Sequence, residues 1–201
     1  MQYPTIRQLF GTGFSFETEK VLLRPLLAED IDGYRKIAFD ENIWKFYPSM
    51  ISNEEELQQF ITDALKGREN QSRVTFTAIY KPTGEIAGST SFGNISERDE
   101  RLEIGWTWIG TTFQRTGINR TNKFLLLNYA FEGLHYERVE FKTDVLNQQA
   151  RKALLGVGCT EEGILRSHTL MNFGRRRDTI YYSILKNEWP SIRNSIFKDY
   201  R

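Results

Sequence analysis

The 201-residue sequence contains one cysteine and two histidines, and each scarcity excludes a class of site. The lone Cys159 has no partner for a disulfide within the chain. It follows Gly158 with no histidine nearby, so we expect a small buried residue rather than a nucleophile. His135 and His168 are too few for a histidine-rich metal site, and we expect no metal.

Long apolar runs and an excess of one charge are also missing. No apolar stretch approaches the roughly 20 residues that cross a bilayer, and the N-terminus lacks the pattern of a signal peptide. The chain has 27 basic and 26 acidic residues, without the basic excess of a nucleic-acid binder. We therefore expect a cytoplasmic protein that binds neither membrane nor nucleic acid.

The hydrophobic pattern that is present predicts one globular domain over residues 1–201, with residues 1–15 as an N-terminal arm. Predicted strands lie at 20–26, 74–80, 85–94, 101–109, 138–144, 159–171 and 179–186. Predicted helices lie at 28–40, from 52 onward, after 119, at 147–157 and at 188–200. This order predicts an α/β (α+β) domain with helices on the faces of a sheet.

Two local patterns make sharper structural predictions. Ser52-Asn-Glu-Glu55 has the spacing of a capping box at the start of a helix. Within residues 101–109 large apolar side chains recur with period two, which predicts that they share one face of the strand. These side chains are Leu102, Ile104, Trp106 and Trp108.

The segment 108–120 joins a predicted strand to a predicted helix. Such a junction exposes backbone N–H groups at the positive end of the helix dipole. Gly117 permits a positive φ and a close approach of a ligand, and Arg115 and Arg120 add positive charge. These features suit a phosphate site, although an ordinary surface turn has a similar composition. The P-loop ending and the three-glycine dinucleotide pattern are absent.

Gln114-Arg-Thr-Gly117-Ile-Asn119 resembles the Gln-x-x-Gly-x-(Gly/Ala) pyrophosphate loop of the GNAT acetyltransferase superfamily. Glu103–Trp108 resembles the strand before that loop, and Asn147-Gln-Gln-Ala150 the start of the helix two elements later. The segment around Glu162–Arg166 and Arg177–Ser183 resembles the closing hairpin of the RimJ/RimL-like branch, which includes ribosomal-protein N-terminal acetyltransferases. The resemblance spans residues 18–190.

This resemblance implies a mixed, mostly antiparallel sheet of about seven strands, with strands 4 and 5 splayed. It implies acetyl-CoA as cosubstrate, with backbone groups of Trp108 and Ile109 pairing with the pantetheine arm. Arg120 would add a side-chain contact, and Asn147 would lie near the sulfur. The implied pyrophosphate amides are those of Gln114, Arg115, Thr116, Gly117, Ile118 and Asn119.

The sequence departs from the family pattern at three positions. Asn119 stands where a Gly or Ala is usual; Asn tolerates left-handed geometry, but its side chain crowds the phosphates. Leu154 stands where many relatives place a tyrosine as acid, and Ala150 lacks a hydroxyl that some relatives have. The general acid therefore has no assignment from the sequence.

Glu103 is the predicted general base, acting through water, because it occupies a strand position where some GNAT enzymes keep a catalytic Glu. The alternative is an ion pair with a basic neighbour such as Arg101. A backbone N–H near Ile109 would polarise the carbonyl. The run from Arg175 to Asp178 favours a solvated turn with Arg177 and Asp178 paired, or else a site that attracts an acidic group.

The predicted acceptor-binding residues are Trp44, Tyr47 and His168. Trp44 and Tyr47 belong to an aromatic cluster with Phe46 and Pro48, for which the alternative is core packing. For His168 the alternative is a surface position. The favoured reaction is acetylation of a protein or peptide N-terminal α-amine. The alternatives are a small amine, such as a polyamine, amino sugar or amino acid, and a non-catalytic acyl-CoA-binding module. A monomer and a homodimer are both compatible with the sequence.

Overall fold

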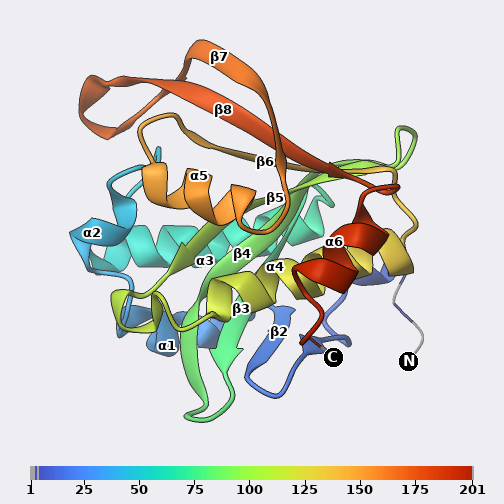
Figure 1. Cartoon of the computed structure of the whole chain (residues 1–201). Helices are drawn as coiled ribbons and strands as arrows, with labels where there is room; N and C mark the ends of the chain where they lie inside the picture. Colours follow the sequence, from blue (N-terminus) through green and yellow to red (C-terminus); the bar gives the residue numbers. More distant parts are fainter. Residues whose placement is uncertain (1–2, 4, 201) are drawn as a thin grey trace.

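The computed structural model describes residues 3 and 5–200. A single eight-stranded sheet runs through the molecule in the order β1-β2-β3-β4-β5-β6-β8-β7 (Figure 1). The strands are β1 Phe16–Glu17, β2 Val21–Pro25, β3 Arg73–Tyr80, β4 Glu85–Ser96, β5 Arg101–Ile109, β6 Arg138–Asp144, β7 Thr160–Leu170 and β8 Arg176–Leu185. All neighbouring strands are antiparallel except β5 and β6, which are parallel.

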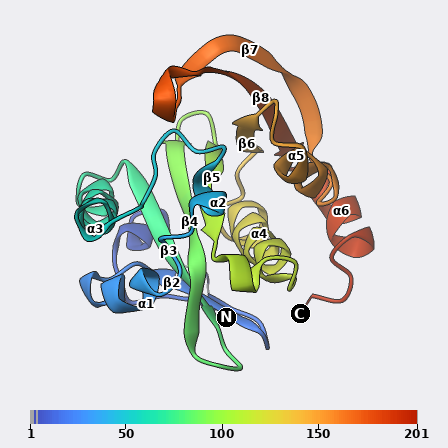
Figure 2. The same ribbon diagram turned by 90° about the vertical axis from the view of Figure 1, so that its left-hand side faces the viewer.

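Helices cover both faces of the sheet. Figure 2 shows α1 and α3 on one side and α4, α5 and α6 on the other. The α-helices are α1 Ile31–Arg35, α2 Glu41–Trp44, α3 Glu54–Glu69, α4 Ile118–Asn128, α5 Gln148–Leu155 and α6 Trp189–Ser195. Helix α4 continues into a π-helical turn at Tyr129–Gly133. No helix among the described residues is long and apolar enough to cross a bilayer.

Two helix starts differ from the sequence prediction. Helix α3 is capped by Asn53, whose Oδ1 accepts from the Glu56 N–H at 2.9 Å, one residue later than the predicted capping box. Glu56 Oε2 in turn accepts from the Ser52 N–H at 2.6 Å, so the acidic side chain binds the residue before the N-cap and not the N-cap itself. The predicted helix 28–40 is reduced to a 3-10 turn at Ala28–Asp30 followed by the short α1. Asp30 is buried there because its carboxylate binds Arg24 of β2.

Strand β5 contains a bulge that the period-two pattern did not predict. Trp106 has φ +50°, and the pairing of β5 with β4 shifts register between Ser89 and Ser91. Leu102 and Ile104 therefore pack on the α4 side of the sheet, whereas Trp108 packs with the cluster around α1 and α3. The prediction of one shared face is wrong beyond Ile104, because one extra residue reverses the direction of every later side chain.

The hydrophobic core has two parts, one on each face of the sheet. The larger cluster lies beneath α4 and α6 and the smaller one beneath α1 and α3. Leu9, in the predicted N-terminal arm, is fully buried in the larger cluster, so residues 5–15 include a docked segment. Cys159 is also buried, as predicted.

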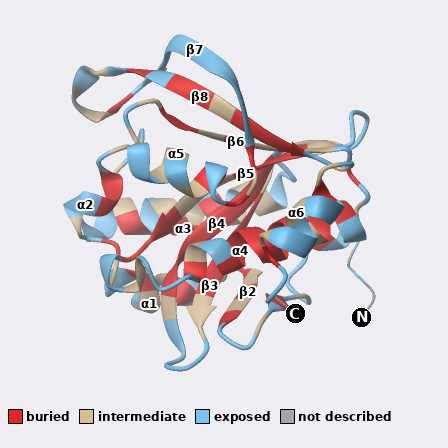
Figure 3. Cartoon of the chain, viewed as in Figure 1, coloured by how far each residue is buried: buried red, intermediate tan, exposed pale blue. Residues whose placement is uncertain are grey.

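Strand β7 forms the outer edge of the sheet and is the most exposed strand (Figure 3). With β8 it makes a long hairpin that arches over α5 (Figures 1 and 2). At the opposite end of the fold, the C-terminal segment packs on α4. The rings of Phe124 and Phe197 lie 5.4 Å apart, and Arg120 donates to the Ile196 carbonyl at 2.8 Å.

Candidate functional site

The sheet splits between β5 and β6. The two strands pair over only three positions, Arg101 with Arg138, Leu102 with Val139 and Glu103 with Glu140. Beyond these positions both strands continue without pairing to each other. The splayed strands 4 and 5 of the resemblance correspond to this parallel pair, which is β5 and β6 when the short β1 is counted.

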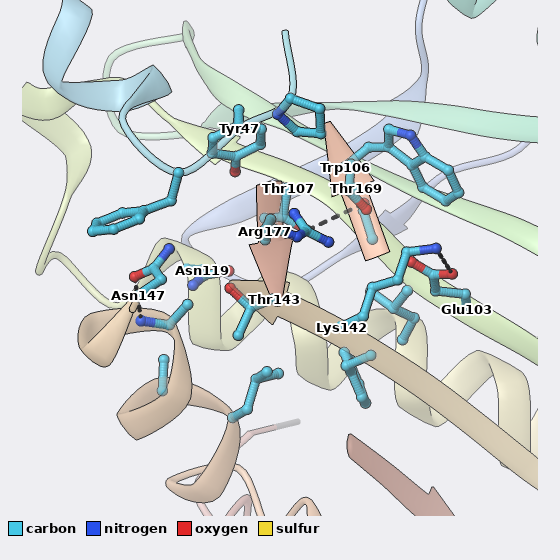
Figure 4. A pocket seen from close by; sticks show the side chains of 18 of the residues that line it. Tyr47, Glu103, Trp106, Thr107, Asn119, Lys142, Thr143, Asn147, Thr169 and Arg177 are labelled. Atoms are coloured by element: carbon cyan, nitrogen blue, oxygen red, sulfur yellow. Dashed lines mark hydrogen bonds and ion pairs between the residues drawn. The ribbon is translucent and has the colours of Figure 1, made fainter. Parts of the chain in front are cut away.

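A pocket of about 360 Å³ lies at this split, and Figure 4 shows side chains that line it. Its lining comes from β5, β6, α4 and α5, from the hairpin of β7 and β8, and from the segment 46–48 after α2. A volume of this size is typical of a small-molecule site. Parts of the chain more than 120 residues apart thus meet where the sheet is open.

The loop after β5 presents a row of free backbone amides at the start of α4. Among the described residues, the N–H groups from Arg115 to Arg120 make no hydrogen bond, and the first helical bond is Thr121 N–H to the Gly117 carbonyl. Arg115 and Gly117 have φ of +64° and +92°, which curls the loop. Such a curl at a helix N-terminus is an anion-binding arrangement.

Internal hydrogen bonds hold this loop in place. The Gln114 side-chain amide donates to the Ile109 carbonyl at 3.1 Å, and Thr116 Oγ1 donates to the Phe113 carbonyl at 2.6 Å. A Cβ added at Gly117 would meet nothing within 4 Å, so the space beside the loop is open. The Asn119 Oδ1 is buried without a partner in the described residues, and Asn119 lines the pocket.

Of the other residues predicted to contact the cosubstrate, Asn147 lines the pocket, whereas Arg120 and Trp108 do not. Asn147 lines the pocket and caps α5, because its Oδ1 accepts from the Ala150 N–H at 3.0 Å. The Arg120 side chain is bound to the C-terminal segment and lies over the Phe197 ring at 5.5 Å. The Trp108 indole is buried away from the pocket, in the smaller core cluster.

Glu103 is 3 % exposed and lines the pocket. Its Oε2 accepts from Lys142 Nζ at 2.9 Å and from Asn94 Nδ2 at 2.6 Å. The ion-pair partner is therefore Lys142, across the split on β6 (Figure 4), and not the neighbouring Arg101. A buried carboxylate with two donors is held in a fixed orientation.

The predicted acceptor residues separate in space. Tyr47 lines the pocket, as do Phe46 and Pro48, and exposed His168 does so from β7, with its Nδ1 3.0 Å from Thr179 Oγ1. Trp44 does not line this pocket. Its indole donates to the Ala38 carbonyl at 2.8 Å within the smaller core cluster, where it borders a second cavity of about 220 Å³.

Two buried cations, Lys123 and Arg177, also line the pocket; Lys123 was not predicted as a site residue, and Arg177 belongs to the run for which a site that attracts an acidic group was the alternative prediction. Lys123 lies one helical turn after Asn119 and touches the Phe141 ring, with Nζ 5.1 Å from its centre. Burial lowers the pKa of Lys123 to about 8. A lysine within the apolar stripe of α4 is a signal that was available in the sequence.

Arg177 is the second of these cations, and its position contradicts the predicted solvated turn. It is 7 % exposed on β8, and its Nε donates to Thr179 Oγ1 at 3.0 Å rather than pairing with Asp178. Asp178 instead accepts from the Ser167 N–H at 2.7 Å. Burial lowers the pKa of Arg177. No feature of the local sequence distinguishes Arg177 from its neighbours.

Comparison with known proteins agrees with this geometry. The family model described as Acetyltransferase (GNAT) domain matches residues 20–160. The chain belongs to the GNAT acetyltransferase family. Members of this family are acetyl-transferring enzymes that use acetyl-CoA, and the eight-stranded sheet with its split is the GNAT architecture.

Three relatives show how far the similarity of this GNAT domain extends. An uncharacterised N-acetyltransferase of Bacillus licheniformis, p20, is 29 % identical over 86 % of this chain and 96 % of its own length. YdaF of Bacillus subtilis (strain 168), a candidate ribosomal N-acetyltransferase by its name, is 36 % identical over 53 % of this chain and 57 % of its own. A crystal structure of a GCN5-related N-acetyltransferase from Brucella melitensis superposes with a TM-score of 0.85 at 27 % identity, covering 92 % of this chain and 84 % of that one.

Proposed function

We propose that this GNAT domain holds acetyl-CoA at the Gln114–Asn119 loop and acetylates an N-terminal α-amine of a protein or peptide. The observation that carries the proposal is the position of the pocket, which reaches the loop at Asn119 and runs along the open edge of β5. Bound acetyl-CoA would supply an activated acetyl group as its thioester.

The residues at the loop fit the cosubstrate. The free N–H groups and the open space beside Gly117 suit phosphate oxygens, which are strong acceptors. The unpaired edge of β5 leaves backbone groups for an extended amide-bearing chain, as in strand addition. Arg115 is exposed in the loop and adds a positive charge there, whereas the guanidinium of Arg120 is held by the Ile196 carbonyl.

The charges of the pocket favour an α-amine over an alkyl amine. The amine must lose its proton before it attacks, and an α-amine has a pKa near ~8 where a lysine amine has one near ~10.4. Lys123 and Arg177 lack a carboxylate partner in the described residues, and two buried cations disfavour a third. An amine that is readily neutral therefore suits this pocket best. The name of YdaF supports an acceptor on a ribosomal protein.

Glu103 would take the proton from the amine through water. Lys142 and Asn94 fix its Oε2, and the carboxylate remains on the pocket wall. Because Leu154 is apolar and lines the pocket, the position expected for a tyrosine cannot supply a proton. Lys123, which also lines the pocket, carries a proton at Nζ.

The test combines calorimetry with acetyl-CoA and thiol release with a panel of amines: N-terminal peptides, a polyamine, an amino sugar and amino acids. Release with the peptides is the expected result. Release with the polyamine or amino sugar alone would favour a small-amine enzyme instead. Tight binding of acetyl-CoA without release on any acceptor would indicate a non-catalytic binding module. Absence of acetyl-CoA binding would overturn the proposal.

The loop assignment is tested by Gly117→Asp, which places a negative charge where the phosphates are proposed to lie. We expect the affinity for acetyl-CoA to fall by about 100-fold or more. Gly84→Asp is the matched control, because Gly84 also has a positive φ (+73°) and an open Cβ position but lies in the β3–β4 turn. Both changes cost about 1 kcal/mol of backbone strain. Equal affinity of the two variants would refute the assignment.

A further inference from the structure

Arg177 differs from the two arginines that precede it. Arg175 forms an ion pair with Asp144, and Arg176 donates to the Ser167 carbonyl at 2.6 Å. Arg177 has no carboxylate within 4 Å among the described residues, and only its Nε is hydrogen-bonded to the protein. Its two terminal nitrogens are without a protein acceptor and are not sealed from the pocket that Arg177 lines.

Burial of this guanidinium is costly unless an anion accompanies it. A charged group removed from water loses several kcal/mol of hydration, which only a partner charge or strong hydrogen bonds restore. The lowered pKa of Arg177 reflects the same loss of hydration. The planar fork of an arginine matches a carboxylate in bidentate geometry.

The lining of the pocket supplies no spare anion for Arg177. Its acidic lining residue, Glu103, is already paired with Lys142. Arg177 lies on the β8 wall, with Thr169 of β7 as its ladder partner and Tyr47, Thr107 and Thr143 around it in Figure 4. This wall is formed by the hairpin and not by the loop at the start of α4, so the missing anion belongs to the acceptor.

We propose that Arg177 binds a carboxylate of the acceptor, so that the enzyme selects amines with a carboxylate close to the amine and rejects polycations. This inference rests on the proposed acetyl transfer and narrows its acceptor. The carboxylate belongs to an acidic first residue of a peptide or to a free amino acid. Both present the same chemistry to Arg177.

The experiment uses the full chain saturated with acetyl-CoA and acceptors that differ only in charge. Peptides that begin with Asp or Glu are compared with peptides that begin with Asn or Gln, and a free amino acid with its amide. We expect kcat/KM to be about tenfold or more higher for each acid than for its amide, with most of the difference in KM. The peptide and amino-acid arms separate the two sources of the carboxylate.

Arg177→Gln should remove the preference, because kcat/KM should fall about tenfold more for the acids than for the amides. Arg176→Gln, on the exposed face of the same strand, is the matched control and should keep the preference. Arg177→Lys keeps the charge and should retain part of the preference for acids. This variant also tests the proposal if Arg177→Gln does not fold. Calorimetric titration of the acid and amide peptides in the presence of coenzyme A gives a second readout that needs no turnover.

Equal kcat/KM and equal affinity for acid and amide in the unchanged protein would overturn this inference, as would a preference that survives in Arg177→Gln. Those results would leave the proposed acetyl transfer intact, because thiol release would still occur. Failure of the transfer itself has a different signature, namely no acetyl-CoA binding and no release with any amine.

Discussion

Lys123 shows how one buried residue can link the site to stability. Its side chain is 7 % exposed, it has no carboxylate partner among the described residues, and it contacts the Phe141 ring. Its pKa is lowered to about 8 by burial, against ~10.4 in an unfolded chain. Below pH 8 Lys123 is protonated in both the folded and the unfolded state, so burying its charge lowers the free energy of unfolding by the full amount. Between pH 8 and about 10.4 the unfolded state binds more protons, so this residue makes stability rise with pH.

Lys123→Met should therefore stabilise the protein at pH 7, by an amount of the order of 3 kcal/mol at most. The stability difference between the variant and the unchanged protein should shrink as the pH rises from 8 to 10. Urea unfolding at several pH values measures it, with exposed Lys152→Met of α5 as control. A difference that stays constant over this range would mean that Lys123 is not buried as a cation.

At the scale of elements, β5 makes a close contact with β4 just beyond its bulge. A Cβ placed on Gly88 would lie 2.2 Å from the Trp108 carbonyl oxygen, so only glycine fits at this position. The contact lies at the end of β5, between the pocket-lining residues Glu103–Thr107 and the loop before α4.

Gly88→Ala should cost about 2 kcal/mol or more, because backbone atoms must move to admit the methyl group. It should also weaken acetyl-CoA binding by displacing β5. Gly13→Ala, where the added Cβ meets nothing within 4 Å, should change neither property. Denaturant unfolding and calorimetry measure the two effects, and a Gly88→Ala protein with unaltered stability would contradict the contact.

The element scale also shows how much the sequence predicts. The bounds of β6 and β5 follow from the sequence alone, because alternation and flanking turns are local signals. The side-chain direction after Ile104 does not, because the bulge arises from pairing with β4. The loop at Gly117 was predicted from a local motif, whereas Arg177 required knowledge of which face of β8 meets the pocket. Glu103 was placed correctly on the strand, but its partner Lys142 comes from another strand.

At the scale of the whole molecule, the C-terminal segment braces the helix that carries the loop. Phe197 is 1 % exposed and packs against Phe124 of α4, and Arg120 of the first helical turn donates to the Ile196 carbonyl. The start of α4 is thus held from outside the sheet by residues almost 80 positions later in the chain.

Phe197→Ala should lower the free energy of unfolding by about 3 kcal/mol or more, as expected for loss of a fully buried ring. Because the segment steadies α4, acetyl-CoA affinity should fall as well. Exposed Lys198→Ala serves as control and should alter neither. Thermal unfolding with and without acetyl-CoA measures both effects. Full stability in Phe197→Ala would show that the segment does not brace the fold.

The short β5–β6 ladder has a mechanical consequence. Three residue pairs join these strands, whereas seven join β6 to β8. The sheet therefore has two parts, β1 to β5 and β6 to β8, which are joined by few pairs. Partial opening of a protein starts where few interactions must break. A ligand bound between β5 and β6 contacts both parts of the sheet. Its binding therefore makes the sheet more rigid.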